Sequence, residues 1–124
     1  MGKYRLANKE FGDWGEQIAV DYLISNKIKV IGRNIRTRYG EIDILGQKDG
    51  IIIFFEVKTR RTEEFGNPED AVDYKKREHM KNSALDYMQS NLDLEMDWRI
   101  DVIAIFVGEN NKLQIRWVKN AFTD

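Results

Sequence analysis

The sequence predicts a layered α/β domain with a mixed central sheet, in the order α-β-β-β-α-β-β. Two observations carry this prediction: apolar segments of strand length are separated by turn signals, and helical segments lie before and among them. The chain has 124 residues, 42% of them hydrophobic and 33% charged, with one proline, which suits one domain with one core. We therefore expect residues 1–124 to form a single domain with an N-terminal arm of about residues 1–10.

Two helices are expected. The first covers residues 11–25, where apolar residues recur at helical spacing and form one stripe. Asn67 is a good N-cap for the second helix and Pro68 suits its first position, so this helix is expected to run to about Ser90. Residues 59–68 before it are expected to form a loop.

Five segments rich in apolar and β-branched residues predict strands. Only Asp49 and Gly50 separate the second from the third, and this pair strongly favours a two-residue hairpin turn. Both strands are apolar on their two faces near the turn, so the hairpin is expected to be central and covered on both sides. The predicted strands cover residues 28–36, 40–48, 51–58, 98–107 and 112–118.

The composition excludes several classes of site. With no cysteine, the chain has neither disulfides nor thiolate metal sites, and with a single histidine, neither a zinc hydrolase nor a histidine-based nuclease is expected. No apolar run approaches the roughly 20 residues that cross a bilayer, and the first residues lack an apolar signal region. A cytoplasmic protein without a membrane partner or a small-molecule cofactor is therefore expected.

Basic residues gather in three runs, although the formal net charge is only −1. The first run lies between Asp21 and Glu41, where the sequence has no acid. Such runs are either ordinary solvated faces or surfaces that hold nucleic-acid phosphates, and both interpretations stay open. The runs comprise Lys27, Lys29, Arg33, Arg36 and Arg38, then Lys58, Arg60 and Arg61, then Lys75, Lys76, Arg77 and Lys81.

The predicted hairpin brings charged residues together. A two-residue turn sets Asp43 directly opposite Glu56 and Glu41 opposite Lys58, with all four side chains on one face of the sheet. The other face carries apolar side chains that include Ile42 and is expected to be core. Two facing carboxylates repel each other unless a cation or a proton lies between them.

A hard divalent cation would satisfy this pair, because Mg²⁺ binds oxygen ligands and often takes one or two carboxylates. Asp43, Glu56 and the backbone carbonyl of Val57 would supply part of its coordination shell. Lys58 would then hold or deprotonate an attacking water and offset charge on a phosphorane-like transition state. The alternative is a surface hairpin in which Lys58 pairs with Glu41 and the acids face solvent, and these residues alone leave both interpretations open.

An acid on one strand followed by E-x-K on the next, here Asp43 and EVK at 56–58, resembles the PD-(D/E)XK nuclease superfamily. Longer segments, in order along nearly the whole chain, are similar to the YraN family, which in turn is similar to Holliday junction resolvases. These segments are FGDWGEQIAVDYL (11–23), RNIRTRYGEIDIL (33–45), FFEVKTR (54–60), GNPEDAVDYKK (66–76) and WRIDVIAI (98–105).

The resemblance implies a restriction-endonuclease-like three-layer core and a DNA endonuclease that uses Mg²⁺ or Mn²⁺ on Holliday junctions or other branched DNA. It implies a site made by Glu16 from the first helix, Asp43, Glu56 and Lys58, with Glu16 reaching the metal through water. Without the resemblance, Glu16 is an ordinary helix carboxylate. Ile42 departs from the pattern, because a proline often stands there. A symmetric junction needs two sites, so a homodimer is expected.

Phosphate contacts are expected from the basic runs, because bidentate guanidinium groups suit DNA backbones. The competing interpretation is a DNA-binding or adaptor protein of DNA repair or recombination that keeps the nuclease fold with little or no catalysis. Asp101 and Arg99 form either a buried pair that holds the site or a plain salt bridge on the sheet face. The expected phosphate contacts are Arg33, Arg36, Arg38, Arg60, Arg61, Lys75 and Lys76.

Overall fold

The computed structural model describes residues 8–61, 74–91 and 95–121. In these ranges the elements follow the predicted order, so the α/β fold class is confirmed. Neither described helix is both long and apolar enough to cross a membrane. The elements are α1 (Asn8–Ser25), β1 (Lys29–Thr37), β2 (Gly40–Lys48), β3 (Ile51–Arg61), α2 (Tyr74–Asn91), β4 (Trp98–Val107), the short 3-10 helix η2 (Glu109–Asn111) and β5 (Leu113–Val118).

Most element limits lie within three residues of those predicted. Residues 8–10, expected in an N-terminal arm, belong to α1. The loop expected from residue 59 begins later, because β3 keeps pairing with β4 as far as Arg61 and Val107. The predicted helix start at Asn67 and Pro68 lies outside the described residues.

The sheet is mixed, with strand order β1-β2-β3-β4-β5. Only β3 and β4 are parallel, and the other neighbours are antiparallel. Asp49 and Gly50 have φ values of 52° and 79°, the left-handed backbone that a tight hairpin turn requires. The predicted hairpin register is confirmed from the Lys48–Ile51 pair to the Ile44–Phe55 pair, where regular pairing of β2 with β3 ends.

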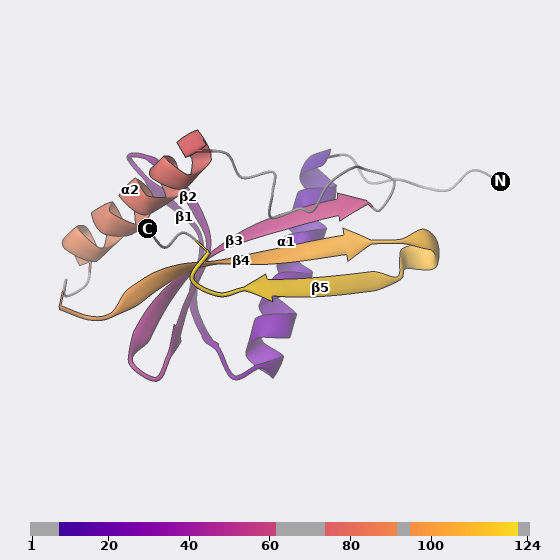
Figure 1. Cartoon of the computed structure of the whole chain (residues 1–124), viewed down its shortest axis with the longest axis horizontal. Coiled ribbons are helices and arrows are strands. Elements are labelled where there is room, and N and C mark those ends of the chain that lie inside the picture. The colour runs from indigo at the N-terminus through magenta and orange to yellow at the C-terminus, as the bar shows by residue number, and fades with distance from the viewer. Residues whose placement is uncertain (1–7, 62–73, 92–94, 122–124) are drawn as a thin grey trace.

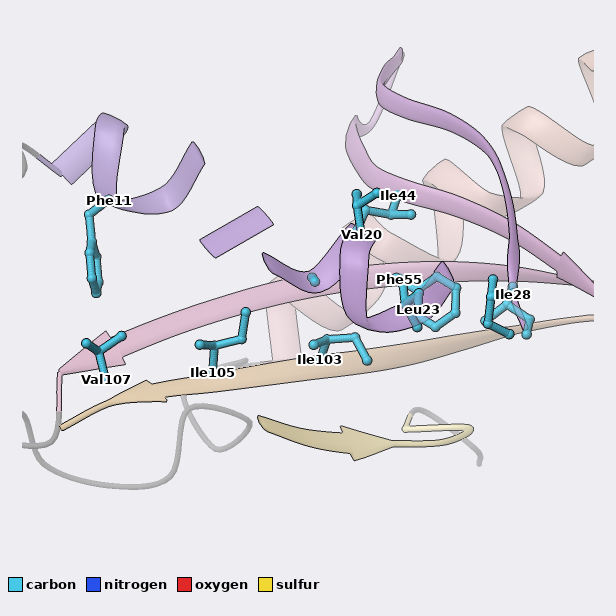
Figure 2. Close-up of a cluster of buried hydrophobic side chains, with 11 residues drawn as sticks. Phe11, Val20, Leu23, Ile28, Ile44, Phe55, Ile103, Ile105 and Val107 are labelled. Carbon is cyan, nitrogen blue, oxygen red and sulfur yellow. The ribbon is translucent and has the colours of Figure 1, made fainter. Parts of the chain in front are cut away.

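The two helices cover opposite faces of the sheet, which gives three layers. Figure 1 shows α1 passing behind β3, β4 and β5, while α2 lies beside β1 and β2. Figure 2 shows side chains of α1 such as Val20 and Leu23 above a row formed by Ile103, Ile105 and Val107 of β4. A second cluster on the α2 face contains Ile42, Leu45, Ile52, Phe54, Ala84, Met88 and Ile100.

Asp101 on β4 is fully buried and ties the last strand to the sheet. Its carboxylate accepts hydrogen bonds from Arg99 Nε at 3.0 Å, Trp117 Nε1 at 2.8 Å and the Asn120 backbone N–H at 2.7 Å. Several donors thus compensate the buried charge, as such a group requires. Asp101 and Arg99 therefore form a buried structural network rather than a salt bridge on an open sheet face.

Gly15 lets α1 approach β3 closely. A Cβ atom at this position would overlap Thr59 Oγ1 and lie 2.9 Å from Thr59 Cβ. This close approach holds the next residue, Glu16, near β3.

Replacing Gly15 with Ala is expected to lower the free energy of unfolding by about 1–3 kcal/mol, because the new methyl group forces α1 away from β3. Gly12→Ala is the matched control, since nothing lies within 4 Å of a Cβ at Gly12. Alanine there is expected to raise stability by about 0.5–1 kcal/mol through its helix propensity. Urea unfolding measures both changes, and equal effects of the two substitutions would contradict the close contact.

Candidate active site

A pocket of about 660 Å³ opens beside the point where β2 and β3 stop pairing. Its walls come from α1, β1, β2 and β3. All five residues predicted for the metal and catalytic site line it, although they come from three separate elements. These residues are Glu16, Asp43, Glu56, Val57 and Lys58.

Asp43 and Glu56 meet inside this pocket. Glu56 is only 5% exposed, and Asp43 Oδ2 accepts a hydrogen bond from the Val57 backbone N–H at 2.9 Å. The two carboxyl groups lie close enough for Glu56 to act on the ionisation of Asp43. Burial, and then the negative charge of Glu56, raise the pKa of Asp43 to about 8. Without a cation, the pair therefore keeps a proton at neutral pH.

Two lysines lie against Glu56 from different sides. Lys58 Nζ is 3.2 Å and Lys76 Nζ is 3.4 Å from the same oxygen, Glu56 Oε1. The sequence predicts that Lys58 lies opposite Glu41 on the neighbouring strand. In the structure, regular pairing of β2 with β3 ends before these residues, and Glu41 pairs with Arg36 of β1. The surface hairpin with solvent-facing acids is therefore not what forms, because Glu56 is buried.

Lys76 was expected only as a phosphate contact, yet it reaches into the acid pair from α2. Its side chain remains 45% exposed, so it lies at the boundary between the pair and solvent. The sequence could not reveal this contact, because it depends on how α2 packs against the sheet.

Glu16 lies beside the pair on α1 and is buried. Its Oε1 atom is 3.6 Å from Arg33 Nη2, and the side chain of Asn34 also lies close to it. Burial raises the pKa of Glu16, while Arg33 and Asn34 oppose that rise. In the described ranges no three Asp, Glu, His or Cys side chains come close enough to hold a metal together. Glu16 nevertheless lines the same pocket as the two acids.

The regular alternation of β2 fails at Asp43. Ile42 was expected on the same face as Ile44, but Ile42 packs in the cluster beside α2, whereas Ile44 packs beside α1. The prediction for Ile42 is therefore wrong, because the strand does not keep its period of two where it leaves β3. This irregularity frees the Asp43 carboxylate to reach the Val57 N–H.

The basic residues expected to hold phosphates lie on several elements, and two of them line the pocket. Arg60 and Arg61 line the pocket, and the Arg61 guanidinium lies 3.9 Å from the centre of the Phe11 ring. Arg38 is drawn towards α2 by Asp86, at 2.9 Å. Arg33 lies beside Glu16 as described, while Arg36 and Lys75 are exposed.

Several polar residues of the pocket were not predicted from the sequence, among them Lys9, Asp13, Asn34 and Thr59. Lys9 and Asp13 form an ion pair of 3.0 Å one turn apart on α1. Their spacing could have placed them beside Glu16, because residues three and four apart in a helix lie on the same face. Nothing in the sequence marks Thr59, whose position follows from its contact with Gly15.

Proteins of similar sequence extend over nearly the full length of this chain. A UPF0102 protein of Syntrophomonas wolfei subsp. wolfei is 43% identical over 115 residues, which cover 93% of this chain and 99% of that protein. A UPF0102 protein of Caldicellulosiruptor bescii is 40% identical over 92% of this chain and 98% of that protein.

Among solved structures, the chain superposes on a repair endonuclease from Pyrococcus abyssi with a TM-score of 0.48 and 20% sequence identity. The match covers 90% of this chain and 42% of that endonuclease. Residues 15–105 match the family described as "Uncharacterised protein family UPF0102". The chain therefore belongs to the UPF0102 family, which is the YraN family that its segments resemble.

Proposed function

We propose that this protein is an endonuclease that hydrolyses DNA phosphodiester bonds with Mg²⁺ or Mn²⁺. The observation that carries the proposal is the acid pair of Asp43 and Glu56: Glu56 is buried and Asp43 half-buried beside an open pocket, with Lys58 next to Glu56. Two carboxyl groups held together away from solvent lower the stability of the folded protein. Carboxyl groups in clefts whose pKa values are shifted are typical of functional sites.

The donor set suits a hard divalent cation. Asp43 and Glu56 offer carboxylate oxygens and Val57 a backbone carbonyl, and the ligands that Mg²⁺ prefers are all oxygens. The metal would supply charge that stabilises the developing negative charge on a phosphate. Glu16 lines the same pocket from α1 and would reach the metal through water.

Each remaining residue has a role that its position supports. Lys58, beside Glu56, would orient the attacking water and, as the neutral amine, take its proton; the ammonium so formed would offset charge on the phosphate. Arg60 and Arg61 at the pocket would hold neighbouring phosphates of the strand. We propose the same for the exposed Arg36 and Lys75.

The proposed substrate is branched DNA, including Holliday junctions, and this part rests on the resemblance to resolvases with a restriction-endonuclease-like fold. Cleavage of both strands of a symmetric junction requires two sites related by a two-fold axis. A homodimer is therefore part of the proposal.

One observation favours the second candidate, a DNA-binding or adaptor protein without catalysis. Glu56 already has two lysines within 3.4 Å, and Asp43 is compensated by a proton, so the pair is satisfied without a metal. In this alternative, Lys58 and Lys76 keep Glu56 in a purely structural network.

Cleavage of labelled DNA separates the two candidates. Linear, flapped and four-way DNA are incubated with wild type and with Asp43→Asn, each with Mg²⁺ and with Mn²⁺. The endonuclease proposal predicts cuts by wild type alone. Binding of branched DNA that weakens with salt but never leads to cleavage would leave the adaptor candidate, while no salt-dependent binding would contradict both.

A further inference from the structure

We propose that Asn34 is a positioning residue for the site: its left-handed backbone reshapes the sheet at Asp43, and its side-chain amide orients Glu16. This inference rests on the proposed function, because Asp43 and Glu16 belong to the proposed metal centre.

Asn34 has an unusual backbone conformation for a residue inside a strand. Its φ is 51°, in the left-handed region, where asparagine is one of the few residues with a side chain that is tolerated. Its two neighbours in β1 pair with Ile44 and Ile42, which sets Asn34 opposite Asp43. Strained backbone inside regular structure persists only where the surroundings enforce it, and it is common at functional sites.

The consequence is visible in the opposite strand. Ile42 and Ile44, on either side of Asp43, pack in clusters on different faces of the sheet. A regular strand would place them on one face. The left-handed residue of β1 and the irregularity of β2 thus coincide, and there the Asp43 carboxylate turns to the Val57 N–H.

The side chain of Asn34 acts on a different acid. It lies close enough to Glu16 to lower the pKa of that carboxyl group, and it lines the same pocket. Arg33 Nη2 lies 3.6 Å from the same carboxylate, so Glu16 lies between two side chains of β1 that lower its pKa. One residue of β1 thus contacts the α1 acid through its side chain and shapes the β2 acid through its backbone.

Two substitutions separate these contributions. Asn34→Gly keeps the left-handed backbone and removes the amide, whereas Asn34→Ala disfavours the backbone as well. The matched controls are Asn110→Gly and Asn110→Ala, because Asn110 has a φ of 58° and is exposed in η2, outside the pocket.

Hydrogen exchange of the Val57 amide, without metal, tests the backbone part. Asn34→Ala is expected to lower protection of this amide by about tenfold or more, because Asp43 loses its position, while Asn34→Gly and both Asn110 variants keep it. Unchanged protection in Asn34→Ala would overturn this part. The measurement needs no cation, so it stands even if the protein binds none.

Titration with Mn²⁺ tests the side-chain part. Asn34→Gly is expected to weaken Mn²⁺ binding by about 10–100-fold, the usual effect of losing a residue that orients a metal ligand. In a protein that already carries Glu16→Ala, the same substitution is expected to cause no further loss of Mn²⁺ affinity. Wild-type affinity in Asn34→Gly, or a further loss beyond that of Glu16→Ala, would overturn it. If wild type itself binds no Mn²⁺, the proposed metal centre fails, and with it the role of the amide.

Discussion

Asp43→Asn is expected to stabilise the metal-free protein at neutral pH and to abolish its stabilisation by Mg²⁺ or Mn²⁺. The asparagine is neutral, as Asp43 is in its protonated form. Its carbonyl can accept from the Val57 N–H, and its amide can donate to Glu56. It therefore keeps an acceptor for the Val57 N–H and a donor beside Glu56 and removes the cost of protonating a carboxyl group at neutral pH, but it is a poorer ligand for a divalent cation.

The pH dependence of stability has a definite sign. The pKa of Asp43 rises from 3.8 to about 8 in the folded state, so between these values the folded protein holds a proton that the unfolded chain has lost. The contribution of Asp43 to the free energy of unfolding is therefore most favourable below pH 4. It falls towards pH 8 by no more than about 1.4 kcal/mol per pH unit. Asp43→Asn removes this part of the slope.

Urea unfolding from pH 4 to 8, with and without Mn²⁺, measures both effects. Asp21→Asn is the control, because Asp21 is an exposed carboxylate on α1 outside the pocket. Saturating cation is expected to stabilise wild type by about 2.7 kcal/mol at 100 times its dissociation constant and to leave Asp43→Asn unchanged. Two results would contradict this explanation of the acid pair. One is a loss of stability in Asp43→Asn at pH 8, and the other is stabilisation of Asp43→Asn by Mn²⁺ as large as that of wild type.

Lys58→Met is expected to reduce DNA cleavage by about 10²–10⁴-fold while leaving Mn²⁺ binding intact. The substitution keeps much of the side-chain volume and removes the only ammonium that the account assigns to the attacking water. Glu56 retains Lys76 as its partner, so the fold is expected to tolerate the change. Because the substitution removes a positive charge near the proposed cation, the affinity for Mn²⁺ is expected to equal or exceed that of wild type.

Lys58→Arg sharpens this test. Arginine keeps the positive charge but stays protonated at neutral pH, so it cannot accept the proton of the attacking water. Lys48→Met, in the exposed end of β2 beside the hairpin turn, is the control for the loss of a lysine. Single-turnover cleavage separates the chemical step from DNA binding. Cleavage by Lys58→Met at the wild-type rate would remove Lys58 from the mechanism, and cleavage by Lys58→Arg would exclude it as the base.

Local sequence patterns predicted the framework of the site. The Asp49-Gly50 turn determined the hairpin register, which brought Asp43 to the end of the paired region beside Glu56. The apolar run of β4 was predicted with its observed limits, Trp98–Val107, because a buried strand that is apolar on both faces has clear ends.

Contacts that depend on packing between distant elements were not predictable. Lys76 reaches Glu56 only because α2 covers that face of the sheet, and no pattern in the sequence specifies this arrangement. The position of Ile42 was predicted wrongly because strand alternation was extended through Asp43, where the backbone is irregular. Asn34 offered a weak local signal, since asparagine tolerates the left-handed region, but the same residue type is common in ordinary turns.

The central claim is that Asp43 and Glu56 hold a divalent cation between them. Crystals of the wild-type protein soaked in Mn²⁺ test it most directly, because anomalous scattering locates the metal independently of the refined coordinates. The account predicts one anomalous peak about 2.1–2.2 Å from a carboxylate oxygen of each residue. An absent peak, or a peak at another place with none between the two carboxyl groups, would contradict this claim.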